Sequence, residues 1–350
     1  MGKIVIIFGI IVLGAFGYLY FSQDIEQGEP EEGLMNKEEA LVVLPVEEYV
    51  ERRTANAFGE YAQYSIQGYH VGEDIEFVDA QDREVPVLAI AEGTVRRANE
   101  ARGYGGIVVI SHMILGEPIN AVYGHIDLSS TELAVGDVVT KGQFIANLGD
   151  HESVETDGER KHLHFALYKG EQLQVQGYER LPELVAAWVN PHNFFAEQGY
   201  SMDSPARTYI PTEEKAGAQY PISFTIPAGY EAEYVAAINA INLYSLSGTE
   251  SAMARSQMFI TKFSGSDFLT LPTVTIHNVV DTVAGKGEYV SKEYDIEKHE
   301  GTPPFANQPS WRSKRHIATD LRIGDTNYVS FSYNPEVSGE VYQSVLDSIE

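Results

Sequence analysis

The sequence predicts a mainly β fold, an antiparallel sandwich or barrel-like domain, preceded by one N-terminal transmembrane helix and followed by an α+β domain. After Phe58, short β-type runs alternate with turn residues at about ten-residue spacing, which favours antiparallel sheets over βαβ units. The chain opens on an uncharged apolar run, which predicts the helix. Beyond residue 220, helix-type and hairpin-type patterns occur together and predict the α+β domain.

The predicted membrane anchor is Ile4–Phe21, an uncharged run about long enough to span a bilayer. Lys3 precedes the run and several glutamates follow it, which places the short end in the cytoplasm and the body of the protein outside. The alternative is a cleaved signal peptide, whose apolar core is usually shorter and ends in small residues. We therefore expect a single-pass protein held in the cytoplasmic membrane through residues 4–21, or a secreted one if this segment is cleaved.

Changes in composition divide the chain into five parts. We assign residues 1–23 to the anchor, 24–51 to an acidic stalk, 52–198 to the β domain, 199–220 to a polar linker and 221–350 to the α+β domain. A helix-like segment, Leu181–Trp188, closes the β domain. The strands predicted before it are Val87–Ala91, Thr94–Ala98, Ile107–His112, Asn120–His125, Phe144–Leu148 and His162–Tyr168.

The α+β domain begins with helical apolar spacing over Glu233–Leu246 and ends with a helix that carries Val341, Val345 and Ile349. Between them, Thr319–Ile323 and Tyr328–Tyr333 flank a Gly-Asp turn and predict a hairpin.

One compact basic and aromatic cluster stands out in the α+β domain: Trp311, Arg312, Lys314 and Arg315. It is either a contact for an acidic polymer or a partner protein, or a solvated loop with one anchoring Trp.

Charge and cysteine content narrow the function classes. The chain carries 51 acidic and 24 basic residues, a formal charge of -27, so its average surface repels phosphate backbones and nucleic acid is excluded as a partner. It has no cysteine. Any metal site must therefore be built from histidine and carboxylate side chains.

Three histidine groups lie in the β domain: His70 with Asp74, His125 alone, and His162 with His164. Side chains two or four positions apart on a strand leave the same face, so each pair can point into one cavity. Two imidazoles and one carboxylate suit a catalytic zinc that keeps a fourth position for water, and further histidines can move protons. Either pair taken singly is also compatible with ordinary surface or core histidines.

Taken in order, these groups and their surroundings resemble the lysostaphin-like, or LytM-type, zinc metallopeptidases. The resemblance covers about 140 residues. The matching segments are Phe58-Gly59, GYHVGEDI (68–75), VPVLAIAEGTV (85–95), GYGGIVVISH (103–112), AVYGHI (121–126), VGDVVTKGQFIANLGD (135–150), KHLHFALYKG (161–170) and VNP (189–191).

This resemblance implies a β-rich duplicated hybrid motif fold and one zinc ion held by His70, Asp74 and His164. It also implies that His162 and His125 are the catalytic pair, and that the substrate is the peptide part of peptidoglycan, cut as an endopeptidase outside the cytoplasmic membrane. The rival hypotheses are a non-catalytic regulator that binds peptidoglycan or a cell-wall amidase, and a secreted protease that acts on proteins. Residues 221–350 could contact a protein or cell-wall partner.

Two features depart from the family pattern or imitate another motif. The small, Ser/Thr/Gly-rich loop of the family is replaced by the charged segment 150–160, which should border the cleft and alter substrate preference. His151-Glu152 begins like an H-E-x-x-H zinc motif, but Glu155 stands where the second histidine belongs, so we interpret this segment as a charged loop. We expect His112 to end a strand and His192 to cap a turn.

Overall fold

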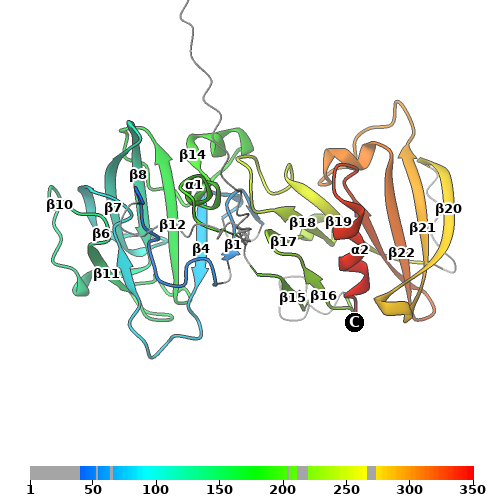
Figure 1. Cartoon of the computed structure of the whole chain (residues 1–350), viewed down its shortest axis with the longest axis horizontal. Coiled ribbons are helices and arrows are strands. Elements are labelled where there is room, and N and C mark those ends of the chain that lie inside the picture. Colours follow the sequence, from blue (N-terminus) through cyan, green and yellow to red (C-terminus); the bar gives the residue numbers. More distant parts are fainter. Residues whose placement is uncertain (1–39, 53, 64–65, 203–204, 211–219, 266–272) are drawn as a thin grey trace, which may run out of the picture. The chain divides into compact units, whose positions relative to one another are not determined.

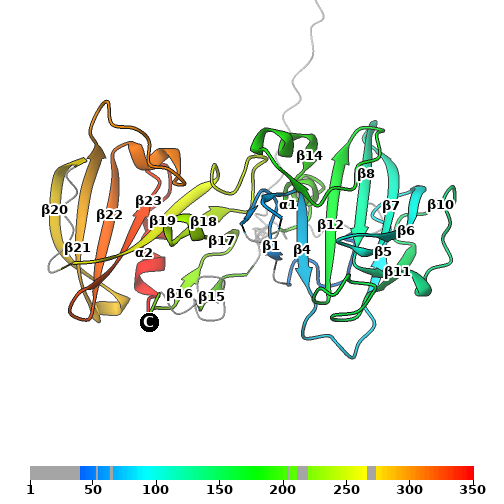
Figure 2. The ribbon, with the colours of Figure 1, turned by 180° about the vertical axis from the view of Figure 1, so that it is seen from behind.

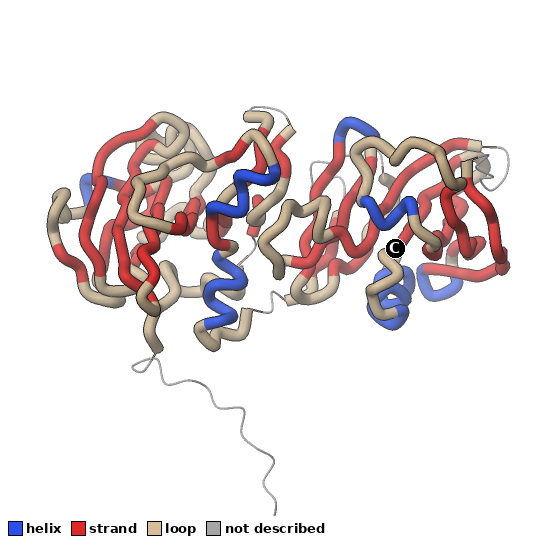
Figure 3. Tube along the Cα trace, turned by 90° about the horizontal axis from the view of Figure 1, so that it is seen from above, coloured by secondary structure: helices blue, strands red, loops and turns tan. Residues whose placement is uncertain are grey.

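The computed structural model describes residues 40–52, 54–63, 66–202, 205–210, 220–265 and 273–350. The predicted anchor Ile4–Phe21 and the first part of the predicted stalk lie outside these residues. Among the described helices, none has the length and apolar character needed to cross a membrane. Strands dominate the described chain and the helices are short (Figure 3). The mainly β prediction is therefore confirmed.

The central element of the first half is an antiparallel eight-stranded sheet (Figure 1). In spatial order its strands are β1 (Thr54–Asn56), β4 (Gly72–Glu76), β12 (His162–Lys169), β8 (Glu117–Gly124), β7 (Gly105–Ile114), β6 (Gly93–Ala101) and β10 (Val138–Val139), with β14 (Trp188–Val189) paired to β12. The strands β4, β12, β8 and β7 are almost wholly buried, and β4 and β12 bury the polar side chains of the candidate site among the apolar ones. Rigid central strands of this kind hold side chains accurately.

Two small three-stranded sheets flank the large one. The first contains β5 (Pro86–Leu88), β11 (Phe144–Leu148) and β9 (Ile126–Asp127), and the second contains β13 (Tyr178–Glu179), β3 (Gly68–His70) and β2 (Tyr61–Ala62). The helical pieces of this half are η1 (Leu128–Ser130), η2 (Pro182–Ala187) and α1 (Pro191–Glu197). Each of the six predicted strands coincides with β5, β6, β7, β8, β11 or β12 to within a few residues.

The second half is built on a seven-stranded antiparallel sheet (Figure 2). In spatial order its strands are β17 (Tyr230–Val235), β18 (Ala240–Ser245), β19 (Ser256–Ser264), β23 (Asn327–Tyr333), β22 (His316–Ile323), β21 (Tyr289–Lys298) and β20 (Val274–Ala284). The short pair β15 (Arg207–Tyr209) and β16 (Phe224–Ile226), the helix α2 (Gly339–Asp347) and the turns η4 (Ala236–Ile238), η5 (Gly285–Gly287) and η6 (Ser310–Ser313) complete it. The predicted hairpin is β22–β23 and the predicted last helix is α2, so both predictions are confirmed.

One of two further helix predictions was wrong. Over 230–245 the buried positions alternate along β17, and Asn239 adopts a left-handed conformation (φ 50°) that turns the chain back into β18 instead of continuing a helix. The helix-like segment predicted over Leu181–Trp188 is confirmed as the 3-10 helix η2 (Pro182–Ala187), and Trp188 begins β14. The α-helix of this region lies later, at α1, where the Asn190 side chain accepts a hydrogen bond from the His192 backbone N–H. His192 therefore begins a helix and does not cap a turn.

The predicted stalk and linker are both too long. Residues 40–51 pack against the first core instead of being solvated, because Val42, Val46 and Tyr49 are buried there. In the predicted linker, Met202 joins the same core, while Tyr209 and Tyr220 join the core beneath α2. The sequence analysis missed these buried residues because the two segments are mostly polar. A few apolar side chains are enough to pack an irregular segment against a core.

Candidate metal centre and catalytic cleft

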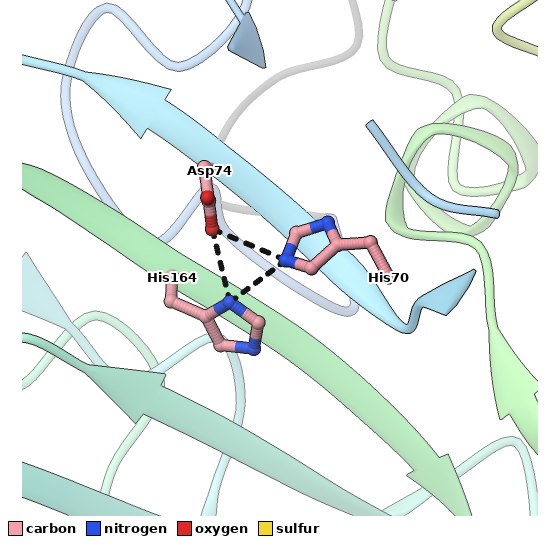
Figure 4. Close-up of side chains that lie close together, drawn as sticks. All are labelled: His70, Asp74 and His164. Atoms are coloured by element: carbon pink, nitrogen blue, oxygen red, sulfur yellow. Dashed lines mark hydrogen bonds and ion pairs between the residues drawn. The ribbon is translucent and has the colours of Figure 1, made fainter. Parts of the chain in front are cut away.

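His70, Asp74 and His164 are brought together by three strands. His70 ends β3, Asp74 lies in β4, and the register of β4 with β12 places Asp74 directly opposite His164. Gly72 lies between the first two, and a Cβ there would stand 2.5 Å from the Phe165 carbonyl oxygen. Only glycine permits β4 and β12 to approach so closely. Local spacing and the long-range pairing of β4 with β12 together assemble the group (Figure 4).

The donor atoms of these three side chains converge on one point. His70 Nε2 lies 3.1 Å from His164 Nδ1, and Asp74 Oδ1 lies 3.2 Å from the first and 3.0 Å from the second. Ligands about 2.0–2.2 Å from a tetrahedral zinc ion lie roughly 3.3–3.5 Å from one another, which is close to these separations. All three side chains are buried. Within the described residues, this trio is the one group of histidine and acidic side chains whose ligand atoms could share a metal ion.

The second oxygen of Asp74 is held by residues that the sequence analysis missed. Asn56 Nδ2 donates to Asp74 Oδ2 at 2.6 Å, and Arg160 Nη2 donates to the same oxygen at 3.2 Å. Arg160 Nε also donates to Glu76 at 2.6 Å. These contacts leave Asp74 Oδ1 directed at the two histidines. Burial would raise the pKa of Asp74, but the neighbouring His70 and His162 and the hydrogen bond from His164 outweigh it and hold that pKa well below its usual range.

His162 presents an unprotonated nitrogen to the cleft. Its Nδ1 lies 2.7 Å from the Arg160 carbonyl oxygen, which can only accept, so Nδ1 carries the proton and Nε2 keeps its lone pair. Nε2 lies 3.7 Å from Asp74 Oδ2. Burial lowers the pKa of His162 to about 4, which keeps the ring neutral at pH 7.

His125 stands beside His162, with 4.2 Å between the two ring centroids. Its backbone has a positive φ of 61°, directly after Gly124, where an added Cβ would meet the Tyr104 ring at 2.4 Å. Burial and then the neighbouring His162 lower the pKa of His125 well below its ordinary value. Its Nδ1 is buried without a hydrogen-bond partner among the described residues. The imidazole therefore keeps one buried polar atom whose hydrogen-bonding capacity no described residue meets.

A cleft of about 760 Å³ opens on this group. His125, His162, His164 and Asp74 line one part of it, and it has the size expected of a small-molecule or peptide site. The remaining walls include Tyr104, Tyr178, Arg102, Glu159, Arg160 and Tyr234. Four of the five residues predicted for the site thus line this cleft, and the fifth, His70, contacts His164 and Asp74.

The other histidines lie elsewhere. His112 lies in β7, where its ring contacts the Glu92 carbonyl, and His151 belongs to an exposed turn of the charged segment 150–160. Of that segment, Arg160 reaches the site, since it directly precedes Lys161 and the buried start of β12. Its position two residues before His162 is the sequence signal that could have identified it. Asn56 offers no comparable signal.

Comparison with known proteins supports a peptidase site. Residues 68–175, which include all five site residues, match the family model described as peptidase family M23. Comparison with curated proteins gave no match.

Several solved structures match part of this chain. LytU is 25% identical, with a TM-score of 0.31, over 42% of this chain and 86% of that one. Csd3 from Helicobacter pylori is 26% identical, with a TM-score of 0.28, over 46% of this chain and 40% of that one. A zinc-containing peptidase from Vibrio cholerae is 22% identical, with a TM-score of 0.28, over 37% of each chain. The chain thus spans less than half the length of the last two proteins. The match of residues 68–175 to the family model is therefore the comparison that bears on function.

Proposed function

We propose that this chain, which carries a domain of the LytM-type peptidase family M23 over residues 68–175, is a zinc-dependent endopeptidase. The observation that carries the proposal is the convergence of His70 Nε2, Asp74 Oδ1 and His164 Nδ1 within 3.0–3.2 Å of one another. Two imidazoles and one carboxylate form a donor set that fits zinc and leaves a position for a further ligand. Zinc bound there supplies Lewis-acid activation of water and of a peptide carbonyl.

His162 is assigned the acid–base role. Its Nε2 lone pair faces the cleft beside the proposed ligands, so it can accept a proton from the attacking water and later pass it to the leaving amine. The hydrogen bond from Nδ1 to the Arg160 carbonyl fixes the orientation and tautomer of the ring.

His125 is assigned the stabilisation of negative charge. A ring N–H at the cleft wall can donate to the oxygen of a scissile carbonyl as charge develops on it. The positive φ of His125 and the tight contact of Gly124 with Tyr104 hold the ring in position before substrate binds. A preorganised donor of this kind contributes most when water is excluded.

The proposed substrate is the peptide part of peptidoglycan, in stem peptides or cross-links, and the proposed site of action is outside the cytoplasmic membrane. The family supports the substrate class. The uncharged Ile4–Phe21 run, with Lys3 before it and glutamates after it, supports a single-pass anchor.

Digestion of purified peptidoglycan with the full chain tests the function, with released peptides identified by mass spectrometry and zinc measured on the same preparation. We expect one zinc per chain and new peptide ends. A zinc-loaded wild type that releases nothing would favour a non-catalytic regulator of the same fold. If the protein cleaves casein but leaves peptidoglycan intact, a general secreted protease would be favoured. Amino-terminal sequencing of the mature protein tests the anchor, which is rejected if the chain begins after Phe21.

A further inference from the structure

The two faces of the C-terminal sheet differ in character. On one face, Leu321, Val329 and Phe331 pack beneath Tyr342 and Val345 of α2, which covers this face in both opposite views (Figures 1 and 2). Strand alternation sends Asp320, Ser330 and Ser332 to the opposite face. The register pairs Asp320 with Ser330, and Ser330 with Thr261 on the next strand. The centre of this second face is therefore polar. Its buried polar side chains need hydrogen-bond partners from a segment that packs on the face.

The segment that contains η6 lies over this polar face. The Trp311 indole N–H donates to the Ser256 carbonyl at 3.0 Å, and Arg312 Nη2 donates to Ser332 Oγ at 3.3 Å. Trp311 and Arg312 are therefore buried, so the basic and aromatic cluster seen in the sequence is not a surface patch. Arg315, by contrast, is exposed and paired with Asp295.

A cavity of about 210 Å³ lies between this segment and the sheet. Its floor includes Arg312, Asp320 and Ser330, which are buried, and its rim includes Phe305 and Ile276, which are partly exposed. The walls are aromatic and aliphatic, with Tyr294, Ile296 and Phe263 among them. The cavity is smaller than the roughly 300–1,000 Å³ of drug-sized pockets, so it suits a single amino-acid residue rather than a saccharide.

Arg312 is the unusual group in this cavity. The side chain donates to Gln308 at 2.7 Å and to Ser332, but no carboxylate lies within 4.0 Å of it in the described part of the chain. Its Nε is buried without a partner there. Burial lowers the pKa of Arg312 to about 10, and the charge of Asp320 on the same cavity wall opposes this shift, so Arg312 keeps its charge at neutral pH. A buried cation is stable only when its charge and donors are met, and an anion is the natural partner of a guanidinium.

Asp320 adds a second polar group of opposite character. It interacts with Ser330, and burial raises its pKa to about 6. As an acceptor on the same cavity wall, it suits an N–H group of a ligand. The last residue of a peptide offers both groups, a carboxylate and an amide N–H on the same α-carbon.

We propose that this cavity binds the carboxyl end of a peptide, with the terminal carboxylate on Arg312, the amide N–H on Asp320 and the side chain against the aromatic wall. The proposal rests on the C-terminal sheet alone and does not depend on the proposed peptidase activity.

Calorimetric titration of the full chain with N-acetyl-D-alanine and N-acetyl-L-alanine tests it, because these probes carry the carboxylate, the amide and a small side chain. We expect saturable binding of at least one of them. The matched N-acetyl-alaninamide, which lacks the carboxylate, should bind at least about ten-fold more weakly, as expected for loss of a hydrogen-bonded charge.

Three variants place the binding. Arg312→Gln should weaken binding at least about ten-fold, whereas Arg315→Gln, which changes an exposed arginine outside the cavity, should leave it unchanged. Ile276→Glu puts a negative charge at the exposed rim without disturbing buried groups, so it should also weaken binding even if Arg312→Gln fails to fold. Absence of binding by all probes, equal binding of acid and amide, or acid binding that survives both Arg312→Gln and Ile276→Glu would overturn the proposal.

Discussion

Two regions of this molecule bury charged side chains, and they do so in opposite ways. In the first half, the Asp74 carboxylate contacts His70, His164 and Arg160. His162 lies nearby, and Arg160 is also paired with Glu76. In the second half, Arg312 donates hydrogen bonds to neutral partners, and Asp320, whose charge acts on it, forms no ion pair with it within 4.0 Å among the described residues. The first arrangement gathers lone pairs and suits a cation, and the second gathers N–H donors and suits an anion. Each set of neighbours thus predicts the charge of what binds there.

The comparison is tested most severely by removing a proposed zinc ligand. His164→Ala or Asp74→Ala should abolish zinc binding and hydrolysis together, because two remaining protein ligands hold zinc poorly. The loss of zinc affinity should exceed the roughly 10–100-fold that is typical when a residue hydrogen-bonded to a metal ligand is removed. Zinc content and peptide release are measured on the same samples. An Asp74→Ala protein that keeps full zinc would show that the metal is held elsewhere.

The proposed catalytic pair should behave differently from the proposed ligands. His162→Ala should reduce turnover by roughly a hundred-fold or more while zinc remains bound, the usual scale for an acid–base group. His125→Ala should lose about 10²–10³-fold through weaker stabilisation of the oxyanion. Zinc analysis and thermal unfolding check that metal and fold are intact. Wild-type turnover in His162→Ala would reject the mechanism.

Arg160 provides a subtler test of the first region. Arg160→Met removes the cation that holds Asp74 Oδ2, so zinc affinity should fall about 10–100-fold, as for other groups that orient metal ligands. Glu159→Gln is the matched control, because Glu159 is largely exposed and 3.6 Å from Arg160. Competition with a fluorescent zinc chelator measures both. Equal zinc affinities in the two variants would show that Arg160 lines the cleft without supporting the proposed zinc site.

The smallest expected effect concerns pH and the second region. His316 donates from Nδ1 to the Lys314 carbonyl, lies edge-on to Trp311 and has a buried Nε2, and burial lowers its pKa from 6.5 to about 4. Between these values the unfolded chain binds more protons than the folded one, so stability is lost as the pH falls from about 6.5 to 4. The full loss is on the order of 3 kcal/mol.

Replacing His316 should remove this dependence. In denaturant unfolding at pH 7 and pH 4.5, His316→Gln should lose less stability on acidification than the wild type. His299→Gln, at an exposed position, should follow the wild type. If His316→Gln and the wild type lose stability equally, the buried ring is not the source of the dependence.

The prediction of the fold succeeded where one local pattern dominated. The predicted strands were correct because Gly-bounded runs such as Phe144–Leu148 have few alternatives. The prediction failed over residues 233–246, where the spacing of apolar residues fits both the helical period of about 3.6 residues and the strand period of about 2. The strand conformation there depends on the pairing of β17 with β18 and of β18 with β19. The sequence of one segment carries no information about such pairing. The prediction also failed at Val42, Val46 and Tyr49, which are buried despite lying in a polar segment.

The sequence by itself determined the chemical identity of the candidate site: five residues of suitable type, with His162 and His164 on one strand face and His70 four positions from Asp74. Only the tertiary structure decided which atoms meet. The register of β4 with β12 directs Asp74 Oδ1 to the histidines, Asn56 and Arg160 hold Oδ2, and the buried position of Arg312 turns an apparent surface cluster into a cavity floor. The physical reason is that side-chain type and spacing are local properties, whereas burial and hydrogen-bond partners come from segments far apart in the sequence, such as His70 and His164, which are 94 positions apart.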